Sequence, residues 1–196
     1  MYKHFFKRVI DIIIGLIALP FVLLVIIIFG PIIYFTDRGP IFYNANRVGL
    51  NMKLFKMYKL RSMKVNAPDL RNEDGSTFNS DNDPRVTSVG LFLRKTSLDE
   101  FPQFINVLKG DMSIIGPRPI LPKDDYSEME EYLIKMKKVR PGITGYNQAY
   151  FRNSISRLDK YKNDAYYAEN LSFIMDTKIF INTIRTVLLS KNINTN

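Results

Sequence analysis

Asp99 and Glu100 are adjacent carboxylates in a stretch that also contains Arg94 and Lys95. Neighbouring cations, and a position at the start of a helix, favour the ionised form of a carboxylate. An ionised carboxylate can attack a phosphorus atom or bind a divalent cation. Because adjacent residues of a helix point in different directions, the two side chains are expected to have separate roles. The pair is therefore the first candidate for a catalytic site.

Glu100 also has a purely structural interpretation. Ser97 and Glu100 have the spacing of a capping box, in which two side chains satisfy backbone N–H groups at the start of a helix. Pro102 fits poorly inside a helix that begins at Ser97, and it fits better near the first position of a helix that begins later. Under either interpretation both carboxylates, Asp99 included, lie at a helix N-terminus.

A second candidate is the sequence GPRP at 116–119. This segment is stiff, because a residue before proline is restricted to extended conformations. It presents the guanidinium of Arg118, a planar group that can bind a phosphate through two hydrogen bonds. The alternative is a rigid turn with a solvated arginine. Lys59 and Arg61 are further candidates, because a strand projects alternate side chains from the same face.

Composition excludes several kinds of site. Cysteine is absent and His4 is the only histidine, which removes thiol chemistry and argues against a Ser-His-Asp triad or a multi-histidine metal site. Neither a GxxxxGKS/T nor a GxGxxG nucleotide loop is present. The chain has 28 Lys and Arg against 19 Asp and Glu, a net charge of +9, which favours anionic partners. Catalysis must therefore depend on carboxylates, lysine, arginine or tyrosine.

Residues 12–35 contain no charge and, at about 1.5 Å per residue, are long enough to cross a ~30 Å hydrocarbon core as one helix. Pro20 interrupts this stretch, and basic residues on both flanks, including Lys7 and Arg8, favour keeping both ends on the same side. We therefore expect a re-entrant helix-break-helix bent near Pro20 rather than a simple transmembrane helix. Asp11 is expected to pair with Arg8, or with a basic residue beyond the apolar run.

The remainder of the chain is predicted to be mostly helical, giving an α+β fold with a small β-hairpin and amphipathic helices at the membrane surface. The expected elements are a hairpin within 40–63, a polar loop over 64–90, and helices over 91–109, in two pieces, 123–138, 157–167 and 169–189. Lys178 and Arg185 suit the last helix to an anionic membrane surface, although its apolar spacing also fits a core helix. Residues 1–36 are thus expected to form a membrane anchor, and residues 37–196 a cytosolic catalytic domain.

Five stretches give the sequence a resemblance to bacterial sugar transferases, in particular the small monotopic phosphoglycosyl transferases that act on polyprenyl phosphates. They are KRVID at 7–11, YKLRSM at 58–63, DNDPRVTSVGLFLRKTSLDEFPQFINVLKGDMSIIGPRP at 81–119, VRPGITGYNQ at 139–148 and NDAYYAENLSFIMDTKIF at 163–180. They follow the family's order and are spread over nearly the whole chain, from residue 7 to residue 180. One departure is Leu19-Pro20, where the family often has Ser-Pro, so the hydroxyl that can bond the carbonyl freed by proline is missing.

The resemblance implies transfer of a sugar-1-phosphate from a UDP-sugar to a polyprenyl phosphate such as undecaprenyl phosphate, with Mg²⁺ as cofactor and UMP as second product. It implies that Asp99 is the nucleophile and a metal ligand, with Glu100 beside it. The residues that it assigns to substrate or phosphate are Lys59, Arg61, Arg94, Arg118 and, as a further functional carboxylate, Asp176. The implied location is the cytoplasmic membrane, in contact with lipid, with the catalytic domain on the cytoplasmic face. We expect a two-step exchange through a covalent phosphosugar on Asp99.

Two other classes compete with this reading. A membrane-tethered binder of nucleic acid or acidic lipid needs basic residues along a stripe with aromatic platforms, whereas here they gather at turns beside carboxylates, so nucleic acid is not an expected partner. A metal-dependent phosphohydrolase uses water in place of the lipid acceptor. Release of UMP from UDP-sugars with and without lipid phosphate separates these classes.

Overall fold

The computed structural model describes residues 1–70, 78, 80, 83–122, 127–151 and 154–188. In chain order the elements are η1 (Tyr2–Phe6), α1 (Lys7–Asp37), β1 (Ala45–Val48), η2 (Leu50–Met52), β2 (Leu54–Met57), α2 (Ser88–Thr96), η3 (Leu98–Glu100), α3 (Gln103–Lys109), β3 (Ser113–Ile115), η4 (Ser127–Met129), α4 (Glu130–Met136), β4 (Gly142–Thr144), α5 (Tyr146–Tyr150), α6 (Arg157–Glu169) and α7 (Phe173–Leu188). The fold is mostly helical with small sheets, as predicted.

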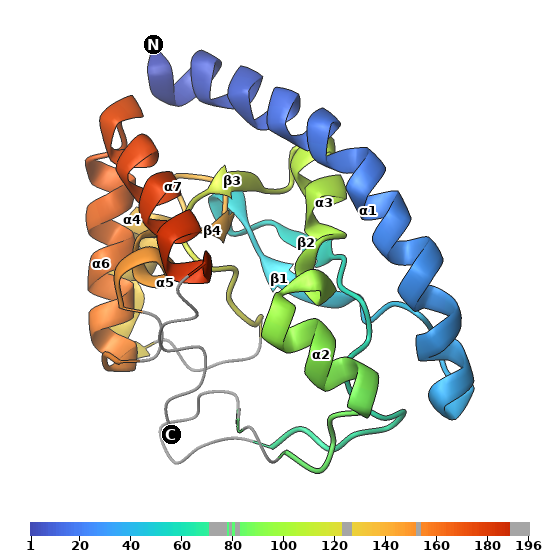
Figure 1. Cartoon of the computed structure of the whole chain (residues 1–196). Helices are drawn as coiled ribbons and strands as arrows, with labels where there is room; N and C mark the ends of the chain where they lie inside the picture. Colours follow the sequence, from blue (N-terminus) through green and yellow to red (C-terminus); the bar gives the residue numbers. More distant parts are fainter. Residues whose placement is uncertain (71–77, 79, 81–82, 123–126, 152–153, 189–196) are drawn as a thin grey trace.

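The apolar N-terminal stretch forms one continuous helix, α1, which contains both Pro20 and Pro31. The break expected at Pro20 is therefore wrong. Proline lacks an N–H, but the helix continues on both sides of it, so one backbone hydrogen bond is lost without ending the element. Within the described part of the chain, α1 is the one helix long and apolar enough to cross a membrane, and only 17% of its most apolar window is buried. Figure 1 shows α1 as a long arch along one side of the molecule.

Both ends of α1 are fastened to the rest of the chain by ion pairs. Near its start, Lys7 Nζ lies 2.8 Å from Asp176 Oδ2 on α7. At its end, Asp37 Oδ1 lies 2.6 Å from Arg61 Nη1. The buried residues of α1 between these points are Asp11, Gly15, Val22, Val25, Gly30 and Ile33. The helix therefore lies against the other elements along its length instead of projecting away from them.

The polar residues before the apolar stretch have partners other than those expected. Asp11 Oδ1 accepts hydrogen bonds from Ser113 Oγ and from the Ile114 N–H, both at 2.9 Å, and makes no ion pair with Arg8 among the described residues. Arg8 instead donates to two carbonyls at the end of α3. A cation is favoured there, because the carbonyl end of a helix carries partial negative charge. These bonds attach the start of α1 to β3 and α3.

The predicted hairpin is confirmed, and it is shorter than the extended pattern suggested. β1 and β2 pair antiparallel, with Ala45 opposite Met57. Because β2 ends at Met57, Lys59 and Arg61 lie beyond the strand and are not held side by side on its face. Leu60, between them, is fully buried in a core with Ile33 and other residues of α1 and α2. The two basic side chains therefore leave this segment toward different parts of the molecule.

A second, parallel pair of strands was not predicted. β3 and β4 pair with Ser113 opposite Gly142 and Ile115 opposite Thr144. The backbones approach closely after β3, since a Cβ on Gly142 would lie 2.1 Å from the Gly116 nitrogen. Glycine at this position therefore permits the close approach that holds the GPRP segment, 116–119, against β4.

The remaining helices largely follow the predicted ranges. The segment 91–109 is interrupted as expected, and Gly110 ends α3 with a φ of 91°. The described part of the predicted helix 123–138 consists of η4 and α4, while 123–126 lie outside the described residues. α7 packs Ile179 into the core and exposes an apolar face. The exposed apolar residues of α7 are Phe173, Ile174, Phe180, Ile181 and Ile184.

Candidate active site

Lys59, Asp99 and Glu100 form a charged cluster where the segment after β2 meets the corner between α2 and α3. Lys59 Nζ lies 2.8 Å from Asp99 Oδ2 and 3.2 Å from Glu100 Oε1. Asp99 is 2% exposed, whereas the other two residues are partly exposed. One ammonium group thus faces two carboxylates, of which one is buried and one is partly exposed.

The corner between α2 and η3 positions the two carboxylates. Ser97 has a left-handed φ of 58°, a conformation that non-glycine residues adopt at some cost, and it turns the chain from α2 into η3. The Asp99 carbonyl accepts the Leu60 N–H at 2.9 Å, which fixes this corner to the segment after β2. The Ser97 side chain makes no capping hydrogen bond, so the alternative of a capping box with Glu100 is wrong. α3 begins after Pro102, as the alternative of a later helix predicted.

The buried oxygen of Asp99 is incompletely satisfied. Asp99 Oδ2 accepts no hydrogen bond from any described residue, because the Lys59 ammonium reaches ion-pair distance without hydrogen-bond geometry. Burial raises the pKa of the Asp99 carboxyl above its ordinary value, since the opposing charge of Lys59 offsets only part of that effect. An oxygen with unused lone pairs and little hydration is suited to attack an electrophile or to bind a cation.

The pKa of Glu100 shifts in the opposite direction from that of Asp99. Burial raises the pKa of Glu100, but the positive charges of Lys59 and Arg118 outweigh it and the pKa is lowered. Arg118 lies on the GPRP segment after β3, and its side chain is exposed. Its charge also acts on Lys59. The structure therefore brings the predicted phosphate-binding Arg118 to the same cluster as the carboxylates.

Arg94 approaches the cluster from α2. Its Nε donates to Ser62 Oγ at 2.9 Å. α2 can lie this close because residue 90 is glycine, and a Cβ there would lie 1.9 Å from the Ser62 carbonyl oxygen. Burial lowers the pKa of Arg94, and Asp99 is the first of the carboxylates that oppose this. The positive charge of Arg94 therefore acts on the buried member of the carboxylate pair.

Two residues predicted for the site lie elsewhere. The Arg61 guanidinium donates to Asp37 and to the carbonyls of Ile33 and Pro40, so its donors hold the end of α1. Asp176 is buried at the start of α1, where it accepts hydrogen bonds from the hydroxyls of Tyr2 and Tyr167 and from Lys7 Nζ. The contacts of Arg61 and Asp176 are with structural elements and not with the Asp99 cluster.

Asp164 on α6 is a residue that the sequence analysis missed. It is buried, it accepts the Asn147 amide at 2.8 Å, and it accepts the Arg118 backbone N–H at 3.4 Å. In the segment Pro117–Pro119 only Arg118 has a backbone N–H, so Asp164 holds the one donor available there. Burial raises the pKa of Asp164 to about 7. The signal was a carboxylate on the buried face of a predicted helix, in line with Tyr161 and Ala168.

Two carboxylates of the cluster are available to hold a metal ion. Among the described residues no group of three Asp, Glu, His or Cys side chains could hold a metal ion by themselves. Mg²⁺ in phosphate-transfer sites is commonly held by one or two carboxylates together with substrate phosphates. Asp99, with its unsatisfied oxygen, and Glu100 fit that pattern. The cluster is therefore suited to a metal ion that arrives with a phosphate ligand.

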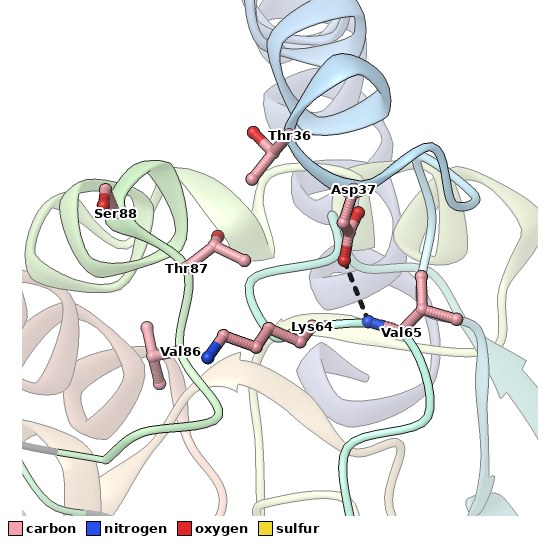
Figure 2. Close-up of a pocket in the computed structure, with 7 residues that line it drawn as sticks. All are labelled: Thr36, Asp37, Lys64, Val65, Val86, Thr87 and Ser88. Carbon is pink, nitrogen blue, oxygen red and sulfur yellow. Dashed lines mark hydrogen bonds between the residues drawn. The ribbon is translucent and has the colours of Figure 1, made fainter.

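A separate hollow of about 490 Å³ lies at the other end of α2 (Figure 2). It is lined by Thr36, Asp37, Lys64, Val65, Val86, Thr87 and Ser88. Asp37 there accepts the Val65 N–H and is ion-paired with Arg61. None of the predicted catalytic carboxylates lines this hollow, and the predicted charged side chains converge instead at the Asp99 cluster.

Comparison with known proteins gives one family. A model described as bacterial sugar transferase matches residues 2–190. The chain is 40% identical to "Galactosyl transferase CpsE" of Streptococcus agalactiae over 96% of this chain and 43% of that protein. It is 37% identical to "Undecaprenyl-phosphate galactose phosphotransferase" of Salmonella typhimurium over 95% of this chain and 41% of that protein.

A shorter relative matches along most of its own length. The chain is 35% identical to "Exopolysaccharide production protein ExoY" of Rhizobium meliloti over 94% of this chain and 86% of that protein. The chain therefore spans less than half of the first two relatives and most of the third. What is common to all three is the segment that contains the Asp99 cluster and α1.

Proposed function

Since the chain belongs to the bacterial sugar transferase family, we propose that it transfers a sugar-1-phosphate from a UDP-sugar to undecaprenyl phosphate and releases UMP. The observation that carries this proposal is the Asp99 carboxylate, whose buried Oδ2 accepts no hydrogen bond from the described residues and is opposed by the charges of Lys59 and Arg94, while Arg118 acts on the neighbouring Glu100. Relatives named as undecaprenyl-phosphate phosphotransferases of galactose, N-acetylgalactosamine and glucose support both substrate classes. The reaction is the first membrane step in assembling a polysaccharide or glycoconjugate.

The transfer proceeds in two steps at one phosphorus atom. Asp99 Oδ2 attacks the phosphorus that carries the sugar, a bond forms between them, and the bond to the bridging oxygen breaks so that UMP leaves with that oxygen. A phosphate oxygen of undecaprenyl phosphate then attacks the same phosphorus and displaces the Asp99 carboxylate. The product is undecaprenyl diphosphate sugar, and Asp99 is regenerated. Splitting the transfer lets one cluster serve a soluble donor first and a lipid acceptor second.

The cationic residues stabilise charge at different places. Arg118 is exposed beside Glu100 and can bind a phosphate through its planar fork. Lys59 offsets the charge of the Asp99 carboxylate in the free protein, and Arg94 acts on the same carboxylate from α2. When Mg²⁺ is bound, it neutralises charge on the diphosphate, and Asp99 with Glu100 are the residues that would hold it.

We propose further that residues 1–36 anchor the protein in the cytoplasmic membrane from one side only. Both ends of α1 make ion pairs with residues 37–196, one with Asp176 on α7 and one with Arg61 after β2. A helix whose ends lay on opposite faces of the membrane would have to break one of these pairs. Its outward residues are large and apolar. The exposed apolar face of α7 continues the apolar surface of α1, since the ring of Phe173 contacts the ring of Tyr2 edge to face. The basic residues that flank the apolar stretch favour the cytoplasmic side for residues 37–196. UDP-sugars are made on that side, so the active site must also lie there.

The reaction is tested by incubating the purified chain with a panel of UDP-sugars, with and without undecaprenyl phosphate, and measuring UMP. We expect UMP release with at least one donor, and catalytic turnover only when the lipid acceptor is present. Release that continues with water alone would favour the phosphohydrolase. A radiolabelled donor sugar that becomes attached to the wild-type chain but not to an Asp99→Asn variant supports the covalent step, and intersecting double-reciprocal lines with no adduct would overturn it.

The topology is tested with single cysteines, because the chain contains none of its own. Lys3→Cys and Arg38→Cys place a thiol beyond each end of the apolar stretch. In intact cells, both should be protected from a membrane-impermeant thiol reagent, and both should react once the membrane is opened. Labelling of one position but not the other in intact cells would instead establish a spanning helix.

A further inference from the structure

The two carboxylates of the candidate active site converge on a cation that belongs to the protein itself. Lys59 Nζ lies 2.8 Å from Asp99 Oδ2 and 3.2 Å from Glu100 Oε1, so it sits between the two side chains that would hold a divalent ion. Asp99 Oδ2 has no hydrogen-bond partner among the described residues, and the Lys59 ammonium is its nearest charge partner. A metal ion shared by these carboxylates competes for the place that the ammonium holds.

The charge of the cluster also disfavours a metal ion on its own. Asp99 and Glu100 carry two negative charges, while Lys59, Arg94 and Arg118 carry three positive charges that act on them. The cluster is therefore already net positive before any metal ion binds. A divalent cation alone increases that excess, whereas a divalent cation together with a diphosphate leaves it unchanged. Electrostatics thus favours joint entry of metal ion and diphosphate.

Lysine is suited to yield its place. Its ammonium is a compact point charge on a flexible stem, and the Lys59 side chain is 22% exposed, so it has room to turn from the carboxylates toward an incoming phosphate. The Asp99 carboxylate has less room to move, because its side chain is only 3% exposed and its backbone is fixed by the hydrogen bond from the Leu60 N–H. The mobile partner in this cluster is therefore the cation.

We propose that Lys59 is the resident counter-ion of Asp99 and Glu100, and that a divalent metal ion displaces it only in company with a diphosphate ligand. This inference rests on the proposed function, which supplies both the metal ion and the diphosphate donor. It makes binding of the metal ion depend on the donor. Lys59 is then a positioning residue in the free protein and a phosphate-binding residue after the donor enters. The donor therefore brings the metal ion with it.

The experiment uses Mn²⁺ as a spectroscopic probe and the full chain in detergent, with no sugar donor and no lipid acceptor. Electron paramagnetic resonance of free Mn²⁺ gives the affinity of the protein for the metal ion alone. We expect weak binding by the wild type and about tenfold or more tighter binding by Lys59→Met, because the two carboxylates then lack their counter-ion. Lys59→Arg keeps the charge and should stay as weak as the wild type.

Lys135→Met is the matched control, because Lys135 also pairs with a carboxylate at 2.8 Å, that of Glu131, but on the exposed surface. Its Mn²⁺ affinity should equal that of the wild type. Thermal unfolding of each variant checks that it is folded. A folded Lys59→Met variant that binds Mn²⁺ no more tightly than the wild type overturns the proposal.

A second measurement decides the matter should Lys59→Met fail to fold. Binding of labelled UDP to the wild type is measured with and without Mn²⁺, and we expect Mn²⁺ to tighten it about tenfold or more, a factor that linkage makes reciprocal for the metal ion. Equal affinity in the two conditions overturns the proposal. Neither measurement involves turnover, so failure of the proposed reaction is recognised separately, as absence of UMP release with every UDP-sugar.

Discussion

Two lysine–aspartate pairs with buried aspartates have the same length and different surroundings. Lys7 Nζ lies 2.8 Å from Asp176 Oδ2 at the start of α1, and Lys59 Nζ lies 2.8 Å from Asp99 Oδ2 at the candidate active site. Both aspartates are nearly inaccessible to solvent. The sequence presents both as candidate functional carboxylates, so the ion pair alone does not distinguish their roles.

Hydrogen bonding distinguishes them. Asp176 accepts from Tyr2 at 2.6 Å and from Lys7 at 2.8 Å on one oxygen, and from Tyr167 at 2.7 Å on the other. Asp99 Oδ2 accepts no hydrogen bond from the described residues. A saturated buried carboxylate stabilises the elements that surround it, whereas an unsaturated one retains lone pairs for a phosphorus atom or a metal ion. Asp37 Oδ1 also accepts no hydrogen bond within the described part of the chain, but Asp37 Oδ2 accepts from Arg61 and from the Val65 N–H, which hold that carboxylate at the end of α1. Four variants test this comparison, taken from the largest expected effect to the smallest.

Asp99→Asn should lower turnover by at least ~10³-fold, because an amide cannot act as the nucleophile. The melting temperature should be unchanged or higher, since Glu100 still compensates Lys59 and the substitution removes a buried carboxylate whose oxygen lacks a hydrogen bond. UMP release and thermal unfolding measure the two effects. Glu131→Gln, on the surface of α4, is the control and should change neither. Substantial turnover by a folded Asp99→Asn would remove Asp99 from the chemistry.

Asp176→Asn should act mainly on stability. Removing one partner of a buried ion pair leaves Lys7 uncompensated, and we expect a loss of about 3 kcal/mol in the free energy of unfolding. Turnover per folded molecule should remain within a few-fold of the wild type, because the contacts of Asp176 lie with Tyr2, Lys7 and Tyr167. Denaturant unfolding at constant pH measures the loss. A stable variant without activity would contradict the structural assignment.

Asp164 is a third buried aspartate, which lies under the GPRP segment, and Asp164→Asn tests its role. Burial raises the pKa of Asp164 to about 7, so the folded protein holds this proton more tightly than the unfolded chain. Stability contributed below pH 4 is therefore lost as the pH rises toward 7. Between pH 5 and 7 the wild type should lose about 2 kcal/mol more stability than Asp164→Asn.

Burial lowers the pKa of Lys137 to about 8, and the charge of Asp164 opposes that shift, so the comparison is made in a Lys137→Met background that removes this second titrating group. Unfolding curves of both proteins at the two pH values give the difference. Parallel pH dependences would show that Asp164 keeps an ordinary pKa and does not link the position of Arg118 to pH.

Arg118→Lys should have the smallest effect of the four. The charge near Glu100 remains, but the planar fork that can bind a phosphate through two hydrogen bonds is lost. We expect kcat/KM to fall about tenfold with little change in melting temperature, because the side chain is exposed. Steady-state kinetics with a UDP-sugar measures this. A value of kcat/KM close to the wild type would return Arg118 to a solvated turn.

The parts of the site that the sequence predicted are the local ones. Asp99, Glu100 and Arg118 lie beside turns whose prolines and glycines have a conformational meaning that can be read from neighbouring residues. The roles of Arg61 and Asp176 depend on partners far along the chain, since Asp176 and Lys7 are 169 residues apart. Single-sequence spacing holds no signal for such a contact.

The fold shows the same division. The hairpin and the later helices follow from alternation, apolar spacing and turn residues. The pairing of β3 with β4 was missed because each strand has three residues, too few for a period, and because parallel pairing joins distant segments. The helix break was wrong because a proline limits only its own hydrogen bond, whereas the buried contacts on both sides of Pro20 hold α1 in one piece.

The long separation between Lys7 and Asp176 has a consequence for the order of events during synthesis. At roughly 5–20 residues per second, α1 leaves the ribosome on the order of ten to thirty seconds before α7 does. Leu60 and Leu93, which pack against Val25 and Ile33, emerge before α7, but at that rate they still follow α1 by on the order of one to ten seconds. Lipid is an apolar environment that α1 can enter in that interval. If α1 anchors the protein as proposed, we expect the helix to reach the bilayer first and residues 37–196 to fold against a helix that is already in the membrane.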